Sequence, residues 1–598
     1  MSKHIYWFAL AAAGLFAAAC SDNDALDSSS AVSDGSSTYM AVNIYMTSDA
    51  ATRSSSTVSG GDFSTGTSAE YAIDFNSSIF LFYASDGSYL TYAIKTTTGT
   101  TNGTTESTDD YVEYTYGAVL VLAPTTLTPS YMVGVFNDAK AESYKGMSLT
   151  ELQEALFNSD NELEATSENA GILMSNAVNY STTDDGFAFA TEISEDNICS
   201  TSEAALASPV EMYVERAKAK VEIGITEGNF TSNEDGTNTY TLQDEEEGTD
   251  DDGNTTITYT DRTFTYYYVD EDGKLTSTSD ATVDITINGW AVNAFNETGY
   301  VIKNYTHDGT ELSSDITGND NAPGGAWGEN WYSEFRIFWA VDGNYAAATS
   351  TDDSWGLKYW TWTGVTTQTT PCSTDAAYYY EQTLDPNATT GYSGGQTAYA
   401  PTLLVAATVS VNTSSSEESS EDGEDIYLSY GSVLYSEKAI YVKILGLLQT
   451  AGYTGDATIS SITWETQEAS KGTVTISSIT MSDGSTDVSS YIGTVNSNDF
   501  ISASASDGST EYYLRKYQGG ASYYQVPIQT YITSSSSPYG LVRNTAYSIT
   551  INSVTGIGAG VPSTGEELTD IPEEDETGSI AAKINILAWR RSSQTVDL

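Results

Sequence analysis

Residues 39–46 read YMAVNIYM and have the alternating pattern of a β-strand, with Met40, Val42, Ile44 and Met46 on one face. The flanking segments do not resemble parts of a folded core. A Ser/Asp/Ala-rich stretch (25–38) precedes this strand, and a Ser/Thr/Gly-rich stretch (47–68) with a single basic residue, Arg53, follows it. An ordered strand between two flexible segments is unusual, so the element with which it pairs becomes the central question.

The rest of the chain indicates a mainly β protein. With 598 residues, it is too long for one hydrophobic core and should contain at least two domains. Residues 77–94 predict a hairpin that turns at Asp86-Gly87, and residues 148–157 predict a short helix with a capping box. Further strands are expected in a second, larger domain that opens at residue 208, at VDITINGWAV, SEFRIFWAV, PTLLVAATVSV, AIYVKILGLL, YYQVPIQTYI and AYSITINSVTGIG.

The charge of the chain limits its partners. There are 82 Asp and Glu residues against 22 Lys and Arg residues, which gives a formal net charge of −60. Such a surface repels phosphate backbones and anionic lipids, so we expect no nucleic-acid partner. Two acid-rich segments, 244–252 and 417–425, are expected to form solvated loops.

The first residues predict export. Lys3 is followed by an apolar run over 5–19 that is too short to span a bilayer and is typical of a signal peptide. The last three residues of this run are alanines, directly before Cys20, and they predict a bacterial lipoprotein acylated at Cys20. The alternative is ordinary signal-peptide cleavage, with Cys20 present there by coincidence. The acidic SDND at 21–24 is similar to the signal that sends Bacteroides-group lipoproteins to the outer surface, although a polar tether would look the same.

No segment of the sequence supports catalysis. Ser393 lies in a G-x-S-x-G match, but the flanking pattern predicts a strand, and His307 precedes the serine instead of following it. We therefore expect a non-enzyme with no cofactor. Weak structural calcium at the carboxylates of 245–254 or 270–274 and sugar binding by exposed aromatic residues stay open, as does pairing of Cys199 with Cys372.

The alternation at the C-terminal end continues through the last residue given. Ile584, Ile586 and Ala588 form one set of alternating positions, and Gln594, Val596 and Leu598 form another. We predict that 584–589 complete the home domain, that 590–593 are a hinge, and that Gln594, Val596 and Leu598 belong to a strand that reaches outward.

Several blocks, in this order, resemble one family: the lipobox at Cys20, TRS at Arg53, IFLFYASDG, ILMSN, PVEMYVERAKAKV, GWAVNAFNETGYVIKN, RIFWAVDGNY, YYYEQTL, LVRNTAYSITINSVTGIG and INILAWRRSSQTVDL. The chain resembles the major fimbrial subunits of Bacteroidales, the type V pilins, and most closely the fimbrilins of short (minor) fimbriae. Ala at the usual Leu position of the lipobox and the acidic inserts depart from that pattern.

The resemblance implies a mechanism of assembly. Type V pilins are exported as lipoproteins, and an extracellular trypsin-like protease cuts them after an arginine, here between Arg53 and Ser54. The cut removes the first strand, here 39–46, and the C-terminal strand of a neighbour fills the groove. The implied fold is two β-sandwich, transthyretin-like domains completed by donor-strand exchange, with a few short helices.

The resemblance also implies partners, a location and limits for the domains. The partners are copies of the chain in a head-to-tail filament, anchor and tip subunits, the protease, and host or bacterial surface receptors; the location is a surface fimbria made from an outer-membrane lipoprotein precursor. The expected units are a signal peptide (1–19), a lipidated propeptide with the removable strand (20–53), an N-terminal β-sandwich domain (54–207), a C-terminal β-sandwich domain (208–589) and a C-terminal donor-strand extension (590–598). The alternative is a monomeric or anchoring surface lipoprotein, or a tip subunit, that binds glycan or a host ligand.

Overall fold

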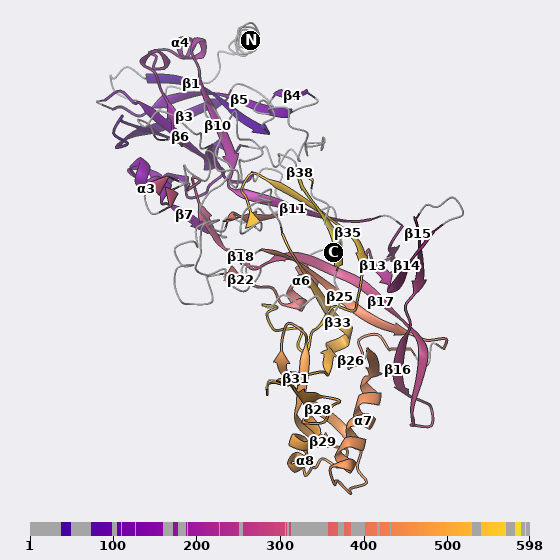
Figure 1. The fold of residues 1–598 in the computed structure, drawn as a ribbon. Helices are drawn as coiled ribbons and strands as arrows, with labels where there is room; N and C mark the ends of the chain where they lie inside the picture. Colours follow the sequence, from indigo (N-terminus) through magenta and orange to yellow (C-terminus); the bar gives the residue numbers. More distant parts are fainter. Residues whose placement is uncertain are drawn as a thin grey trace.

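The computed structural model shows a mainly β chain (Figure 1). It describes residues 38–48, 73–98, 104–108, 111–125, 127–158, 171–177, 187, 189–226, 228–249, 255–304, 306–307, 310–311, 357–368, 376–383, 401–415, 419–430, 432–506, 508–528, 540–569, 580–587 and 592–593. The mainly β class predicted from the sequence is confirmed.

The N-terminal strands form a ring. Their hydrogen-bonded order is β1-β10-β8-β6-β2-β3-β5-β4, and β1 also pairs with β5, so the strands from β1 to β5 close on themselves. The bounds are β1 Thr38–Ser48, β2 Ile79–Tyr83, β3 Tyr89–Thr98, β4 Thr104–Thr108, β5 Tyr111–Leu122, β6 Tyr131–Phe136, β8 Met174–Asn176, β9 Thr191–Glu192 (beside β6) and β10 Val210–Arg216.

Local signals in this unit behave as the sequence predicts. The turn between β2 and β3 has Gly87 at φ 79°, a conformation that favours glycine, and the Asp86 carboxylate accepts a hydrogen bond from the Ser88 amide. Helix α3 (Leu149–Gln153) begins with the predicted capping box, in which Ser148 and Glu151 bond each other's backbone amides. Helix α4 (Ser202–Ala207) leads into β10.

The second unit is a sandwich of two sheets. One has the order β23-β11-β35-β37-β38 and the other β28-β29-β32-β26-β27-β16-β17-β25-β33-β36, and buried side chains of both share one apolar core. The bounds are β11 Lys218–Ile225, β16 Phe264–Val269, β17 Leu275–Asn293, β23 Ala377–Tyr380, β25 Thr402–Asn412, β26 Ile426–Ser429, β27 Val433–Ser436, β28 Ile459–Glu468, β29 Thr473–Met481, β32 Arg515–Tyr517, β33 Ala521–Pro527, β35 Ala546–Val554, β36 Ala559–Gly560, β37 Ile580–Leu587 and β38 Ser592–Ser593.

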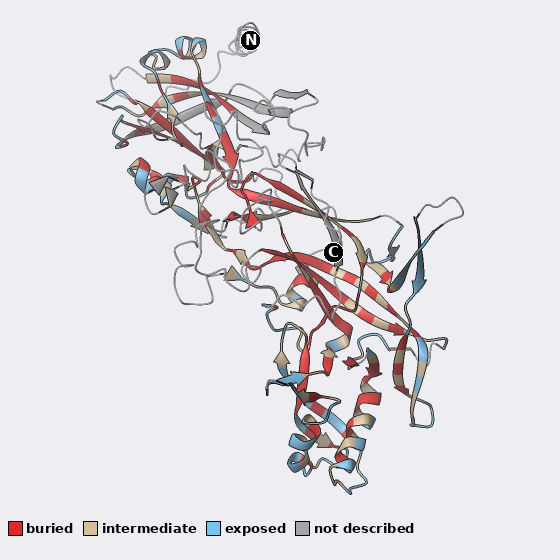
Figure 2. Ribbon diagram, in the orientation of Figure 1, coloured by how far each residue is buried: buried red, intermediate tan, exposed pale blue. Residues whose placement is uncertain are grey.

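Further short elements lie within the described chain. They are β7 Leu156–Asn158, β12 Thr231–Ser232, β13 Asn238–Thr241, β18 Phe295–Asn296, β19 Thr298–Tyr300, β20 Thr306–His307, β21 Thr310–Glu311, β22 Leu357–Lys358, β24 Gln382–Thr383, β30 Ser502–Ser504, β31 Thr510–Tyr512, β34 Gly540–Leu541, α6 Trp362–Gln368 and α8 Ser489–Asn496. Figure 2 shows that the buried residues concentrate along the middle of the strands of the ring and of the second unit.

One predicted strand is wrong. The segment AIYVKILGLL lies inside helix α7 (Glu437–Thr450), which Ser436 caps by accepting a hydrogen bond from the Ala439 amide. Ile440, Ile444 and Leu448 recur every four residues and are fully buried in one apolar core with residues of β28 and β29. This period is helical, and it outweighs the β-propensity of the isoleucines and valine.

The acid-rich segment 244–252 is in part a strand. Its described residues lie in β14 (Gln243–Thr249), which pairs with β15 (Thr255–Asp261) to form a two-stranded arm at the side of the second unit (Figure 1). The prediction of a solvated loop missed this pairing, because the Thr-rich alternation of β15 supplies a partner strand. The described part of 417–425 has no helix or strand, as predicted.

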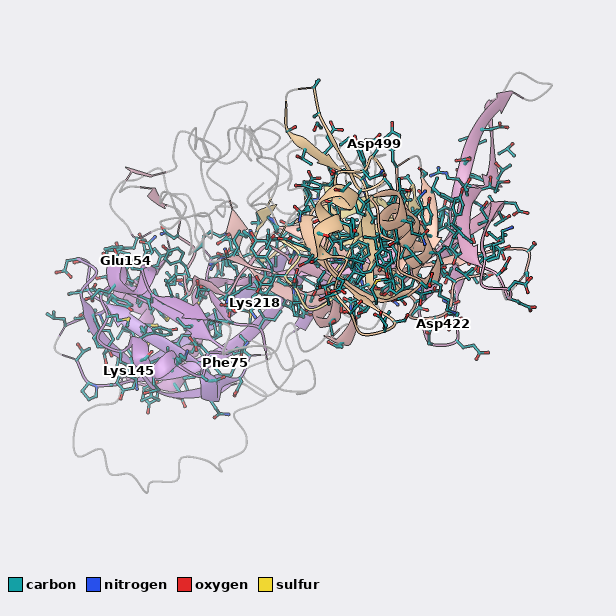
Figure 3. The ribbon with its side chains drawn as sticks, turned by 90° about the horizontal axis from the view of Figure 1, so that it is seen from below. Phe75, Lys145, Glu154, Lys218, Asp422 and Asp499 are labelled. Carbon is teal, nitrogen blue, oxygen red and sulfur yellow. The ribbon has the colours of Figure 1, made fainter. Side chains whose placement is uncertain are left out.

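The chain passes between the two units at Ala217. Val210–Arg216 pairs with β1 and β8 in the ring, and Lys218 begins β11 in the second unit. This crossing lies later in the chain than residue 208, and the full domain limits stay a prediction. Figure 3 places Lys218 between the two bodies of side chains.

Candidate functional site: the slot of the first strand

Strand β1 occupies an inner position in the ring. All eleven of its residues, from Thr38 to Ser48, pair antiparallel with β5, and Val42 to Tyr45 pair in parallel with β10. The backbone of Tyr39 also bridges to Cys199, with N···O distances of 2.8 and 2.9 Å. Because β1 has a neighbour on each side, its loss would leave two strands with unpaired amides and carbonyls.

The inward face of β1 is the one that the alternation predicts. Met40, Val42 and Ile44 are each 0% exposed and pack with Phe80, Phe82, Leu120 and Met212, among others, in the core of the ring. Burying side chains of this size stabilises a fold by roughly 1.5–3 kcal/mol each, so the three together contribute about 5–9 kcal/mol. Met46 lies in β1, but its side chain is outside the described residues.

The other predicted site residues cannot be placed on this slot. Cys20, Arg53, Ser54, Gln594, Val596 and Leu598 lie outside the described residues, as do Ser393 and Cys372. Cys199 is a free thiol in the described part of the chain. Whether it pairs with Cys372 therefore stays open.

The C-terminal region joins the second unit through β37. This strand pairs antiparallel with β35 from Ile580↔Val554 to Leu587↔Ala546. Ser592 and Ser593, in the predicted hinge, form β38 and pair back onto Ile586 and Asn585. Of the residues predicted to complete the home unit, 584–587 lie in β37, and the division between 589 and 590 falls outside the described residues.

Among the described residues, no group of three or more His, Cys, Asp or Glu side chains could hold a metal ion. At one calcium candidate, the Asp270 carboxylate accepts hydrogen bonds from the amides of Lys274 (2.9 Å) and Asp272 (3.1 Å), and these bonds lower its pKa. With Gly273 at φ 77°, this geometry is that of a hairpin turn. The other candidate, 245–254, is only partly described.

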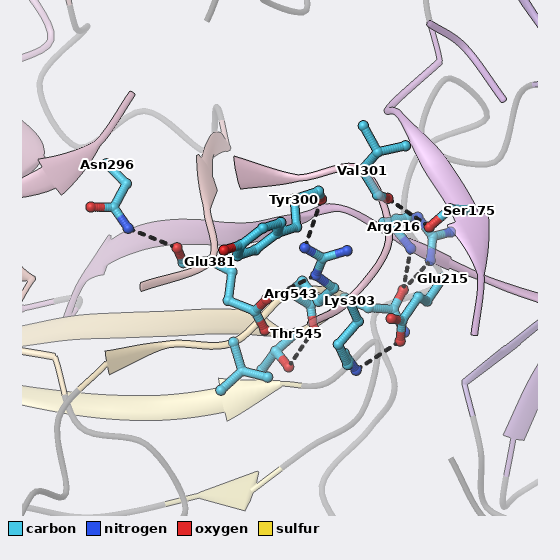
Figure 4. A network of polar contacts seen from close by, with 12 residues as sticks. Ser175, Glu215, Arg216, Asn296, Tyr300, Val301, Lys303, Glu381, Arg543 and Thr545 are labelled. Atoms are coloured by element: carbon cyan, nitrogen blue, oxygen red, sulfur yellow. Dashed lines mark hydrogen bonds and ion pairs between the residues drawn. The ribbon is translucent and has the colours of Figure 1, made fainter. Parts of the chain in front are cut away.

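A buried ionic network, which the sequence did not predict, lies where the two units meet (Figure 4). Lys303 Nζ is 2.9 Å from Glu215 Oε2, and Arg543 Nε is 3.0 Å from Glu381 Oε2, with all four side chains at most 2% exposed. Burial raises the pKa of the Glu381 carboxyl, and the nearby cations, Arg543 first, oppose that rise.

Hydrogen bonds extend this network to both units. Arg543 donates to the Tyr300 carbonyl (2.9 Å), and Ser175 of β8 donates to the Val301 carbonyl (2.8 Å). Val301 also packs with Leu173 in a second apolar cluster, which includes Ile79 and Leu81 of β2. Buried charges with several partners hold one geometry, so the network fixes the ring relative to the second unit.

The comparisons bear on the C-terminal part of the chain. Residues 515–595 match the family model of the major fimbrial subunit protein type IV, fimbrillin, C-terminal. The match covers β32 to β38 and confirms the predicted resemblance to fimbrial subunits over these residues. Comparison with curated proteins gives no match.

Solved structures give loose likenesses over nearly the whole chain. A candidate cell adhesion protein from Parabacteroides distasonis is 11% identical, with 92% of this chain and 99% of that chain covered and a TM-score of 0.29. The tip fimbrial protein Mfa3 from Porphyromonas gingivalis, truncated at its C-terminus, is 8% identical, with 92% and 100% covered and a TM-score of 0.24. Such TM-scores are too low to carry an argument. No helix among the described residues is long and apolar enough to cross a membrane.

Proposed function

We propose that this chain, with its fimbrillin-type C-terminal segment, is the stalk subunit of a cell-surface fimbria that polymerises by strand exchange at the slot of β1. One observation carries the proposal: β1 closes a ring of strands, yet its covalent connection to the rest of the ring runs through residues 49–72. Arg53 lies within that connection, so one cut after it would turn β1 into a separate peptide.

Export and processing would precede assembly. The precursor would be acylated at Cys20, carried to the outer surface and cut between Arg53 and Ser54 by a trypsin-like protease. The acyl group and β1 would then leave together, because both precede the cut. The expected limits, 54–207 and 208–589 for the two domains and 590–598 for the extension, belong to the same proposal, except that β10 (Val210–Arg216) is counted with the first unit because it pairs in the ring.

The vacated slot supplies the driving force for assembly. Departure of β1 exposes the apolar side chains that Met40, Val42 and Ile44 cover and frees the facing edges of β5 and β10. A strand from another copy can restore both the burial and the pairing, which is β-augmentation. The contact is head-to-tail and does not close on itself, so it propagates as a filament.

The donor strand would come from the residues after β37. The predicted extension comprises residues 590–598, and within it Val596 and Leu598 would take apolar positions in the slot, with Gln594 at a third. Pairing of Ser592 and Ser593 with β37 would have to be released first. Anchor and tip subunits would end the filament, and surface receptors of host or bacterial cells would be its targets.

Mass spectrometry of surface filaments tests the processing step. The expected mature N-terminus is Ser54. A chain that keeps an acyl group on Cys20 in mature surface material would overturn the stalk role and leave an anchored lipoprotein.

Deleting residues 594–598 tests the donor. The expected result is a folded, processed monomer that forms no fibres. Because Val596 and Leu598 carry the apolar contribution, V596D should have the same effect, and S593A serves as the neighbouring control that keeps polymerisation. Normal fibres from both the deletion and V596D would remove the C-terminal residues from the mechanism.

A further inference from the structure

A separate part of the second unit carries exposed aromatic residues. Strands β25 and β33 pair directly, from Thr402↔Pro527 to Thr408↔Ala521, although more than a hundred residues separate them in the chain. The intervening segment builds its own apolar core with α7, α8, β28 and β29. In Figure 1 these elements lie at the end of the molecule opposite β1, so a strand exchanged at the ring leaves them uncovered by the ring itself.

Among the described residues at this end, Tyr430 is the most exposed of the large apolar side chains. It lies in the turn between β26 and β27, and its side chain is 75% exposed. Two residues later, Ser432 has a φ of 59°, which is unusual for a residue other than glycine. The first strand of this hairpin is packed in the fold, because the side chains of Tyr427 and Leu428 are buried. A large aromatic ring is thus exposed directly after a strand whose own side chains are buried.

A second tyrosine and two carboxylates accompany it. The ring centroids of Tyr430 and Tyr513 are 5.2 Å apart at 53°, and the Tyr513 hydroxyl donates to Glu511 Oε2 at 2.8 Å. This bond, together with the charges of Glu511 and Asp499 and the ionisable hydroxyl of Tyr430, raises the pKa of the Tyr513 hydroxyl. Asp499 is exposed at the surface of this unit (Figure 3).

We propose that Tyr430, Tyr513, Glu511 and Asp499 form a shallow binding platform for neutral sugar residues. Two tilted tyrosine faces offer rigid, amphipathic area on which the C–H face of a pyranose ring can lie. Exposed carboxylates accept hydrogen bonds from sugar hydroxyls, with no need for a deep pocket. The platform gives the chain a ligand-binding role that is independent of polymerisation.

Charge selects the class of sugar. The carboxylates of Glu511 and Asp499 are negatively charged, and the whole chain has a formal net charge of −60. Sialylated, sulfated or uronic sugar residues, which are also anionic, would therefore be repelled. Nucleic acids and anionic lipids are disfavoured for the same reason. Neutral hexoses and N-acetylhexosamines combine apolar faces with hydroxyl donors and carry no opposing charge.

The experiment is binding of the full chain to an immobilised panel of neutral hexose and N-acetylhexosamine oligosaccharides, with sialylated and sulfated oligosaccharides alongside. Affinity for at least one neutral probe should fall about tenfold or more in Y430A, whereas Y430F should stay near the original value because the ring remains. E511Q should weaken binding without abolishing it. Y259A is the matched control, since Tyr259 is 56% exposed on the β14–β15 arm, away from the platform.

Three results would overturn the proposal. They are absence of binding to every neutral probe, binding that Y430A leaves unchanged, and stronger binding to the acidic panel. Because the assay uses soluble chain and reads sugar affinity, its failure leaves the strand-exchange proposal untouched. Loss of fibres in the 594–598 deletion would in turn leave sugar binding intact.

Discussion

Truncating Ile44 to alanine should destabilise the ring of the uncut chain and have no effect on cut, polymerised subunits. Ile44 is fully buried and lies opposite Met212 of β10 and Tyr116 of β5. Ile→Ala at such a site removes about 2–5 kcal/mol from the free energy of unfolding, through lost burial and the cavity left behind. In the proposed polymer β1 has been removed, so the same substitution would have nothing to weaken.

Hydrogen exchange followed by mass spectrometry measures this locally. In uncut I44A, amides of β5 and β10 should exchange about 30-fold faster or more, the ratio that corresponds to a loss of about 2 kcal/mol. I257A is the matched control: Ile257 is 50% exposed on the arm, and its truncation should change stability by less than about 0.5 kcal/mol.

Two outcomes would refute the reasoning. If polymerised I44A subunits lose as much protection as the uncut chain, then β1 remains in its slot and no exchange takes place. If uncut I44A keeps its full protection, then β1 does not support the ring, and its removal could not drive assembly.

K303M should lower the free energy of unfolding in denaturant by about 3–5 kcal/mol because a buried carboxylate loses its cation, whereas K438M at an exposed pair should cost at most about 1 kcal/mol. G87A should lower the melting temperature clearly more than G236A: both have positive φ, but only at Gly87 would the new methyl meet a phenyl ring. The pKa of the Asp270 carboxyl is lowered in the folded chain, so its ionised form stabilises the fold fully at pH values above its ordinary pKa near 3.8. That stabilisation is lost as the pH falls below 3.8 towards the lowered pKa, so D270N should show a shallower loss of stability in acid.

Sequence reasoning succeeded where the signal is local. The Asp86-Gly87 turn and the Ser148 capping box each depend on residues within three positions of one another, and both form as expected. Helix α7 was mistaken for a strand because branched residues were weighed above spacing. Ser436 at its start and the period of four from Ile440 were the signals that could have corrected it.

The ionic network lay beyond such reasoning. Glu215, Lys303, Glu381 and Arg543 are spread over more than three hundred residues, and no local pattern marks them as neighbours. Charged residues in a chain are normally exposed, so each taken alone predicts a solvated side chain. Only the crossing at Ala217 and the packing of the ring on the second unit bring them together.

The inner position of β1 sets a stricter demand on a donor than an edge would. A strand added to an edge satisfies one ladder, but the vacated slot has an antiparallel neighbour, β5, and a parallel one, β10. A donor running in the direction of β1 would reuse both hydrogen-bond patterns, whereas a reversed donor would need a new pattern on each side. Release of such a donor breaks two ladders and exposes the apolar face at once. In the proposed filament, the two ladders and that face would oppose the mutual repulsion of the strongly negative subunits. Screening over about 8 Å in physiological salt would confine that repulsion to the contact itself.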